Sequence, residues 1–279
     1  MLASLLIVFR EVLEAGLIVG IVLAATQGIA RRGAYVVGGI ASGVLGAALL
    51  ATFAGEVSNA LAGSGQEVFN ASVLIVAVIM LAWHNIWMAS HGRVIAREMK
   101  AMGQAVAAGE KSLLAMAVVV AAAVLREGSE VVLFLYGVAK STHSGAAAML
   151  TGGALGICAG GLVSFLLYRG LLAIPVKRLF SVTSWLIALL AAGMAGQAAA
   201  ILAGADLIPA WGYQLWDTSW LLPDSTLLGR ALQALAGYSD RPMGVQLAAY
   251  GVTLAALLIA TRLVNKPPQR PPERALASR

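Results

Sequence analysis

Seven apolar runs, each close to the length needed to cross a lipid bilayer, constrain the fold of this chain more than any other feature. They fall near residues 4–27, 34–55, 69–90, 112–138, 146–168, 180–204 and 245–263. A transmembrane helix needs about 20 mostly apolar residues. Since 60% of the chain is hydrophobic and only 11% is charged, the sequence predicts an all-α polytopic membrane protein with seven transmembrane helices.

The basic residues predict how these helices are oriented. Fourteen of the 19 Lys and Arg residues fall in 28–33, 91–111, 169–178 and 262–279, which would all lie on one side of the membrane. Short basic loops stay cytoplasmic, so we expect the N-terminus outside and the C-terminus inside. The net charge of +6 is therefore explained by topology, and no nucleic-acid partner is expected. The opening "MLASLLIVF" lacks the basic start of a signal peptide, so the first helix is expected to be retained.

An internal repeat is visible in the first and fourth runs. "FREVLEAGLIVGIVLA" at 9–24 matches "LREGSEVVLFLYGVAK" at 125–140, an offset of 116 residues, and both contain Arg-Glu-x-x-Glu. The next two runs of each half also correspond, so the repeat unit is three helices. Because three is odd, the second unit enters the membrane in the opposite direction, which gives a 3+3 inverted repeat plus one C-terminal helix.

This organisation predicts six consecutive parts of the chain. They are a first three-helix repeat (1–91), a cytoplasmic linker (92–111), a second three-helix repeat (112–204), an extracytoplasmic segment (205–244), the seventh helix (245–263) and a basic cytoplasmic tail (264–279). Glycines spaced at small-xxx-small intervals, such as Gly39 with Gly43 and Gly152 with Gly156, predict close helix contacts.

The two Arg-Glu-x-x-Glu motifs are the candidate functional site. Positions three apart share a helix face, so Glu11 with Glu14 and Glu127 with Glu130 can converge as four carboxylates. Arg10 and Arg126 each precede a glutamate by four residues, which allows an ion pair within each helix. Six unpaired charges inside a membrane would cost on the order of 15–20 kcal/mol, so pairing or a bound cation must offset them. The formal charge of −2 and the hard oxygen donors favour a di- or trivalent cation.

The paired motifs resemble those of the oxidase-dependent iron permease family, which includes the fungal high-affinity iron permease and the bacterial Efe-type iron permease. The resemblance extends over almost the whole chain, through "AWHNIWMASHGR", "GMAGQAA", "LWDTSWLLPDS" and "GYSDRPMGVQLAAY". Val12 and Ser129 depart from the family's common Arg-Glu-Gly-Leu-Glu, but neither change alters a charge.

The resemblance implies an iron permease of the inner (cytoplasmic) membrane that imports ferric iron. A separate extracytoplasmic oxidase or iron-delivery protein would supply the ion. It also implies that the four glutamates coordinate the metal and that Arg10 and Arg126 balance charge. No permanently bound cofactor is expected, since iron is the transported substrate.

Several further residues are weaker candidates. Met80, His84 and Met88 share one helical face, and His91 lies one turn beyond, so these four side chains could form a metal pathway. Gln197 could line the same pathway or bond to a neighbouring helix. Trp83 and Trp87 are interpreted as packing or interfacial residues. Three aspartates of the extracytoplasmic segment could capture an arriving cation, or could belong to a solvated loop: Asp206, Asp217 and Asp224.

Two alternative functions remain open from the sequence. One is a transporter of another polyvalent cation, such as manganese or lead. The other is an intramembrane metal-dependent hydrolase, in which the carboxylates hold a metal that activates water. Hydrolase sites of this kind usually recruit two or more histidines, and only His84 lies well inside a predicted span.

Overall fold

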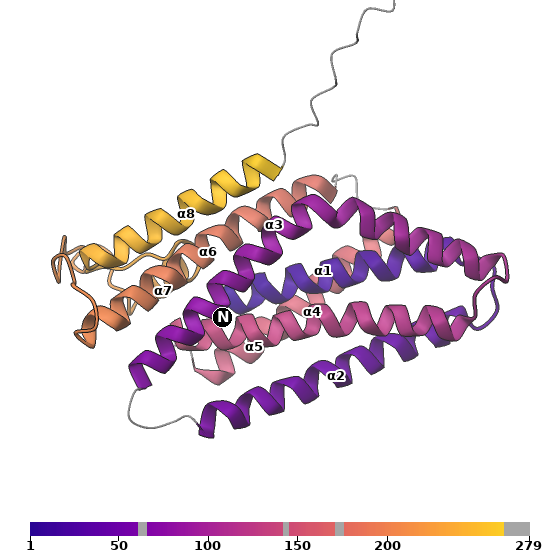
Figure 1. Ribbon diagram of the computed structural model, residues 1–279, viewed down its shortest axis with the longest axis horizontal. Coiled ribbons are helices and arrows are strands. Elements are labelled where there is room, and N and C mark those ends of the chain that lie inside the picture. Colours follow the sequence, from indigo (N-terminus) through magenta and orange to yellow (C-terminus); the bar gives the residue numbers. More distant parts are fainter. Residues whose placement is uncertain (61–65, 142–144, 171–175, 265–279) are drawn as a thin grey trace, which may run out of the picture.

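The computed structural model describes residues 1–60, 66–141, 145–170 and 176–264, and over this part of the chain it is all-helical (Figure 1). Its eight helices are α1 (Leu2–Ala25), α2 (Arg32–Ala60), α3 (Gln66–Ala107), α4 (Leu113–Ser141), α5 (Ala146–Tyr168), α6 (Val176–Gly204), α7 (Leu227–Ala236) and α8 (Gly244–Val264). The predicted basic tail lies almost entirely outside the described residues.

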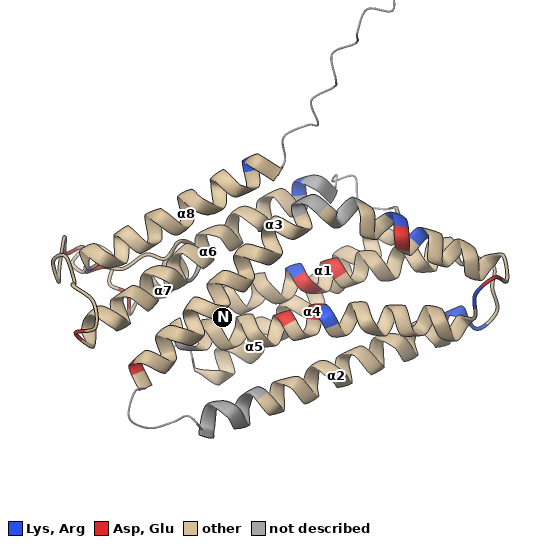
Figure 2. Cartoon of the chain, in the orientation of Figure 1, with Lys and Arg blue, Asp and Glu red and all other residues tan. Residues whose placement is uncertain are grey.

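Five of the helices are long and apolar enough to cross a membrane. These segments are 32–53 in α2, 66–88 in α3, 146–168 in α5, 180–204 in α6 and 244–264 in α8. The expected all-helical polytopic architecture is therefore confirmed. α1 and α4 are also long enough, but each carries an arginine and two glutamates near its middle, whereas the five apolar segments have no Arg, Lys, Asp or Glu near theirs (Figure 2).

The most extensive helix contacts pair α1 with α5 and α2 with α4, and glycines make both contacts possible. A Cβ atom on Gly156 of α5 would lie 2.8 Å from the Leu5 carbonyl oxygen and 2.9 Å from the Phe9 amide nitrogen. A Cβ atom on Gly43 of α2 would lie at the same two distances from the Ala121 oxygen and the Leu125 nitrogen of α4. The predicted small-residue helix contacts are thus confirmed, and the two contacts have the same geometry.

Replacing Gly156 by leucine is expected to destabilise the bundle. The new side chain would collide with the α1 backbone, which cannot move as a flexible side chain could, at a cost of about 1–3 kcal/mol. The matched control is Gly161→Leu on the same helix, because a Cβ atom there meets nothing within 4 Å. Thermal unfolding of purified protein should show a lower melting temperature for Gly156→Leu alone. Equal melting temperatures for the two variants would contradict this packing.

The middle of the bundle is formed by α1, α3, α4 and α6, and it contains two apolar clusters. One gathers Ile7 of α1, Leu81 of α3, Phe134 of α4 and Met194 of α6, together with their neighbours. The other gathers residues of α1 to α4: Val22, Val36, Val106, Met116, Val120 and Val124. Along both α1 and α4, the charged motif lies between residues of the first cluster and residues of the second.

Two helical segments differ from the expectations. α3 continues to Ala107, so residues 92–107 of the expected linker are helical, and Met99, Met102 and Val106 pack with the second apolar cluster. The segment 205–244 contains the short helix α7, whose first turn is capped by Thr226 and which ends at Gly237 in the left-handed conformation (φ 68°). The α3 extension is stabilised by apolar packing on one face, and α7 is stabilised by its two caps. A search for membrane spans detects neither feature.

Candidate functional site

The first motif is buried inside the bundle. Arg10, Glu11 and Glu14 of α1 are almost inaccessible, and the Arg10 Nε atom lies 3.0 Å from the Glu14 Oε1 atom. The predicted ion pair between positions four apart is therefore confirmed. Glu11 is less well paired, because its nearest guanidinium nitrogen, Nη1 of Arg10, is 3.7 Å away, longer than a hydrogen bond.

The second motif repeats this arrangement in α4 with more exposure. The Arg126 Nε atom donates a hydrogen bond to Oε1 of Glu130 at 3.3 Å, which confirms the second predicted ion pair. Glu127 is buried, whereas the Arg126 side chain is 37% exposed and the Glu130 side chain is 14% exposed.

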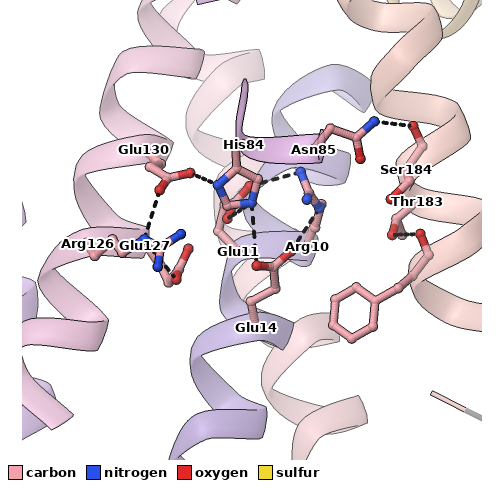
Figure 3. A network of polar contacts seen from close by, with 11 residues as sticks. Arg10, Glu11, Glu14, His84, Asn85, Arg126, Glu127, Glu130, Thr183 and Ser184 are labelled. Atoms are coloured by element: carbon pink, nitrogen blue, oxygen red, sulfur yellow. Dashed lines mark hydrogen bonds and ion pairs between the residues drawn. The ribbon is translucent and has the colours of Figure 1, made fainter. Parts of the chain in front are cut away.

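His84 of α3 lies between the two motifs (Figure 3). Its Nδ1 atom contacts Glu130 of α4, and its Nε2 atom lies 3.4 Å from Glu14 and 3.8 Å from Glu11 of α1. The ring is buried and makes an edge-to-face contact with Phe134. One imidazole therefore connects the carboxylates of both helices.

Four side chains are close enough to hold one metal ion together. Glu11, His84, Glu127 and Glu130 each offer a ligand atom, and these atoms lie within 4.8 Å of one another. Within the described part of the chain, both oxygens of Glu11 and the Oε2 atom of Glu127 are buried without a hydrogen-bond partner. Buried acceptors are costly to leave unpaired, so this arrangement favours a ligand that pairs with them.

The donor set suits a hard or borderline cation. Three of the four ligating groups are carboxylates and the fourth is imidazole, a combination typical of iron and manganese. Glu14 is oriented toward Arg10 and His84, and it is not one of the four grouped ligands. The apolar clusters on both sides place the site in surroundings of low polarity, which strengthens the attraction between a cation and these carboxylates.

The other predicted pathway residues lie at varying distances from this cluster. Met80 lines a cavity beside His84, whereas Met88 is half-buried in α3 and is not one of the residues lining that cavity. His91 is exposed and stacks on Trp87, with ring centroids 5.0 Å apart. Gln197 is half-buried in α6, and none of the described contacts joins it to the carboxylates. A pathway role for Met88, His91 and Gln197 stays a prediction.

The extracytoplasmic aspartates are bonded within their own segment. Asp217 pairs with Arg241 at 3.1 Å, and hydrogen bonds from Ser219 lower the pKa of its carboxyl group. Asp224 accepts a hydrogen bond from the Asp240 amide, and burial, with the Asp240 charge second, raises its pKa. The Tyr213 hydroxyl donates to Asp206 at 3.4 Å. Cation capture by these three aspartates stays a prediction.

Two residues were missed as neighbours of the site. Asn85 is buried and donates to the Ser184 carbonyl oxygen of α6 at 3.5 Å. Trp87, interpreted as a packing or interfacial residue, stacks on the guanidinium group of Arg126, whose central carbon lies 4.3 Å from the ring centroid. The sequence feature that could have placed Trp87 at the site is its position, because it follows His84 by three residues and therefore shares its helix face.

Comparisons with known proteins show the family to which the sequence is similar. Residues 1–265 match the profile of the Iron permease FTR1 family. The protein named ferrous iron permease EfeU from Escherichia coli O6:H1 is 31% identical over 268 residues, which cover 93% of this chain and 95% of the relative. The EfeU proteins of Shigella sonnei and Yersinia pestis are also 31% identical, over 94% and 93% of this chain and 96% and 92% of their own lengths. No solved structure gives a significant match.

Proposed function

The chain belongs to the Iron permease FTR1 family, and from this premise we propose that it imports iron through the cluster of Glu11, His84, Glu127 and Glu130. It is a multi-pass protein of the inner membrane and a transporter, not an enzyme. The observation that carries the proposal is the convergence of these four side chains in a buried place where carboxylate oxygens lack partners.

We assign distinct roles to the charged side chains. Glu11, Glu127, Glu130 and His84 coordinate the ion, and Glu14 orients His84 from the other side. Arg10 and Arg126 balance charge, since four glutamates and two arginines give a formal charge of −2 that a bound cation would offset. Met80 belongs to the path by which the ion moves.

The architecture proposed for this transport is seven spans arranged as an inverted repeat, with the N-terminus outside. Residues 1–91 and 112–204 form the two halves, and α8 is added to them. The contacts between the helices of the two halves support this arrangement. Ala121 and Leu125 of α4 contact Gly43, and Leu5 and Phe9 of α1 contact Gly156. Each of these α4 residues lies 116 positions after the corresponding α1 residue. The offset between the two charged motifs has the same value. α1 and α4 would then cross the membrane at the centre as a pair.

The oxidation state of the ion separates two candidate substrates. We propose ferric iron, supplied by a separate extracytoplasmic oxidase, because carboxylates outnumber the single imidazole and hard oxygen donors prefer the harder ion. Ferrous iron is the second candidate. It is favoured by the name of the relatives, ferrous iron permease, by the imidazole ligand and by the formal charge of −2, which a divalent cation balances completely.

Uptake into liposomes that contain the purified protein tests this proposal. Ferric iron kept soluble by citrate should accumulate above the level of protein-free liposomes, and faster than ferrous iron kept reduced by ascorbate. Faster ferrous uptake would assign the second candidate. A preference for manganese or lead would assign another cation, and no uptake of any of these ions would contradict the permease function.

A further inference from the structure

A cavity of about 380 Å³ opens between α3 and α4 and reaches the metal-binding cluster. It is lined by Met80, Trp83, His84 and Trp87 of α3, and by Arg126 and Glu130 of α4. Two of the side chains that contact the cavity therefore belong to the cluster itself. The cavity gives Glu130 and His84 a connection to the outside of the bundle.

The two charged motifs differ in their access to this cavity. In α1, the side chains of Arg10 and Glu14 are each 1% exposed, so the first motif is enclosed. In α4, the corresponding Arg126 and Glu130 side chains are 37% and 14% exposed and line the cavity. Because the motifs have nearly the same sequence, their surroundings cause this difference. An ion that enters or leaves the cluster would meet the second motif.

The face of α3 that lines the cavity continues toward the basic end of that helix. Met80, His84, Trp87 and His91 follow one another at intervals of three or four residues, so they share one face. His91 is exposed and stacks on Trp87. Under the proposed orientation, α3 runs from outside to inside, so this face leads from the cluster to the cytoplasm.

The Trp87 ring gives Arg126 a cation–π contact in addition to its ion pair with Glu130. The guanidinium group is bonded to Glu130 at 3.3 Å and also lies over the Trp87 ring. A cation that binds the Glu130 carboxylate weakens the first of these interactions, because both compete for the same oxygens. The ring can still hold the guanidinium group, since a cation is attracted to the face of an indole. No aromatic ring lies in stacking contact with Arg10 in the described part of the chain, so the first motif has no equivalent of the Trp87–Arg126 contact.

We infer that the ion leaves the cluster for the cytoplasm through the α3–α4 cavity, and that Trp87 is a positioning residue that holds Arg126 aside while the ion passes Glu130. This inference rests on the proposed function, because it names the release route of the same site.

Thiol labelling tests whether water reaches the cavity from the cytoplasm. Met80→Cys would be made in a Cys158→Ala background, since Cys158 is the only cysteine and is exposed. The control is Val76→Cys, which lies one turn earlier on α3, is 53% exposed and does not line the cavity. A charged, membrane-impermeant thiol reagent on inside-out vesicles should modify Met80→Cys at least about tenfold faster, because a thiol surrounded by lipid stays protonated and unreactive.

Manganese should slow the labelling of Met80→Cys, since the ion would occupy the cluster at the end of the cavity. Equal labelling of the two variants, or labelling of Met80→Cys only from the outer face, would overturn the route. The readout does not depend on iron transport. Labelling in a protein that takes up no iron would contradict the proposed function, whereas iron uptake without labelling would contradict the route alone.

Substitution of Trp87 tests its positioning role. Trp87→Leu should lower the initial rate of iron uptake by about threefold to tenfold, the range expected from loss of a cation–π contact. Trp87→Phe should restore most of the rate, because the ring face is kept. Equilibrium manganese binding should be similar in both variants, since Trp87 is not a ligand. A Trp87→Leu rate equal to wild type, or equal losses for Leu and Phe, would overturn the role.

Discussion

Replacing Glu127 by glutamine is expected to abolish iron uptake while the protein still folds. Glu127 is buried, and one of its oxygens lies within 4.8 Å of the ligand atoms of Glu11, His84 and Glu130. Glutamine keeps the size of the side chain but removes its negative charge. Loss of residues that merely support a metal ligand lowers metal affinity about 10- to 100-fold, so loss of a charged ligand should cost at least as much.

The measurement is the initial rate of radioactive iron uptake by liposomes, with equal amounts of inserted protein. Glu98→Gln is the matched control, because Glu98 lies exposed on α3, away from the cluster. It should transport at the wild-type rate. The double variant Glu11→Gln with Glu127→Gln should be little worse than either single variant, since residues acting on one ion are not additive. Wild-type uptake by Glu127→Gln would remove this carboxylate from the mechanism.

Replacing His84 by glutamine is expected to have the second-largest effect. His84 contacts Glu130 with one ring nitrogen and approaches Glu14 and Glu11 with the other. The substitution removes the one nitrogen ligand among the four grouped side chains, and among the described residues it removes the side chain that contacts carboxylates of both motifs. We expect iron uptake to fall at least about tenfold, and the preference for iron over magnesium to weaken, because imidazole favours iron whereas oxygen ligands also suit magnesium.

Competition of magnesium with iron during uptake provides the measurement for His84. The control is Glu98→Gln, because Glu98 lies exposed on the same helix, away from the cluster. It should retain most of the uptake rate and the normal preference for iron. If His84→Gln and Glu98→Gln behave alike, His84 is a packing residue and the cluster consists of carboxylates alone.

Most of the helical architecture could be predicted from the sequence, because a bilayer requires long apolar segments whose limits are marked by charge. Predicted and observed helix ends agree within a few residues for α1, α5 and α8. The extension of α3 could not be predicted in this way. Residues 92–107 are too polar for a membrane span, and they are stabilised by Met99, Met102 and Val106 packing on α1 and α4.

The ion pairs of the candidate site could also be predicted, since they depend only on the spacing of four residues along a helix. The sequence also identifies His84 as a candidate for a metal pathway, and the structure places it among the grouped ligands. Two features could not be predicted. Glu14 is oriented toward Arg10 and His84 instead of joining the grouped ligands. The Arg126 side chain is partly exposed, whereas Arg10 is enclosed. These features follow from how neighbouring helices cover each motif, which the nearly identical motif sequences do not encode.

The central claim is that iron binds between Glu11, His84, Glu127 and Glu130, and anomalous diffraction at the iron absorption edge tests it most directly. Crystals of the protein grown with iron should show one anomalous peak in direct contact with carboxylate oxygens of α1 and α4 and a ring nitrogen of His84. The peak should disappear in Glu127→Gln crystals grown under the same conditions. A peak at the extracytoplasmic aspartates with none between α1, α3 and α4 would contradict the account.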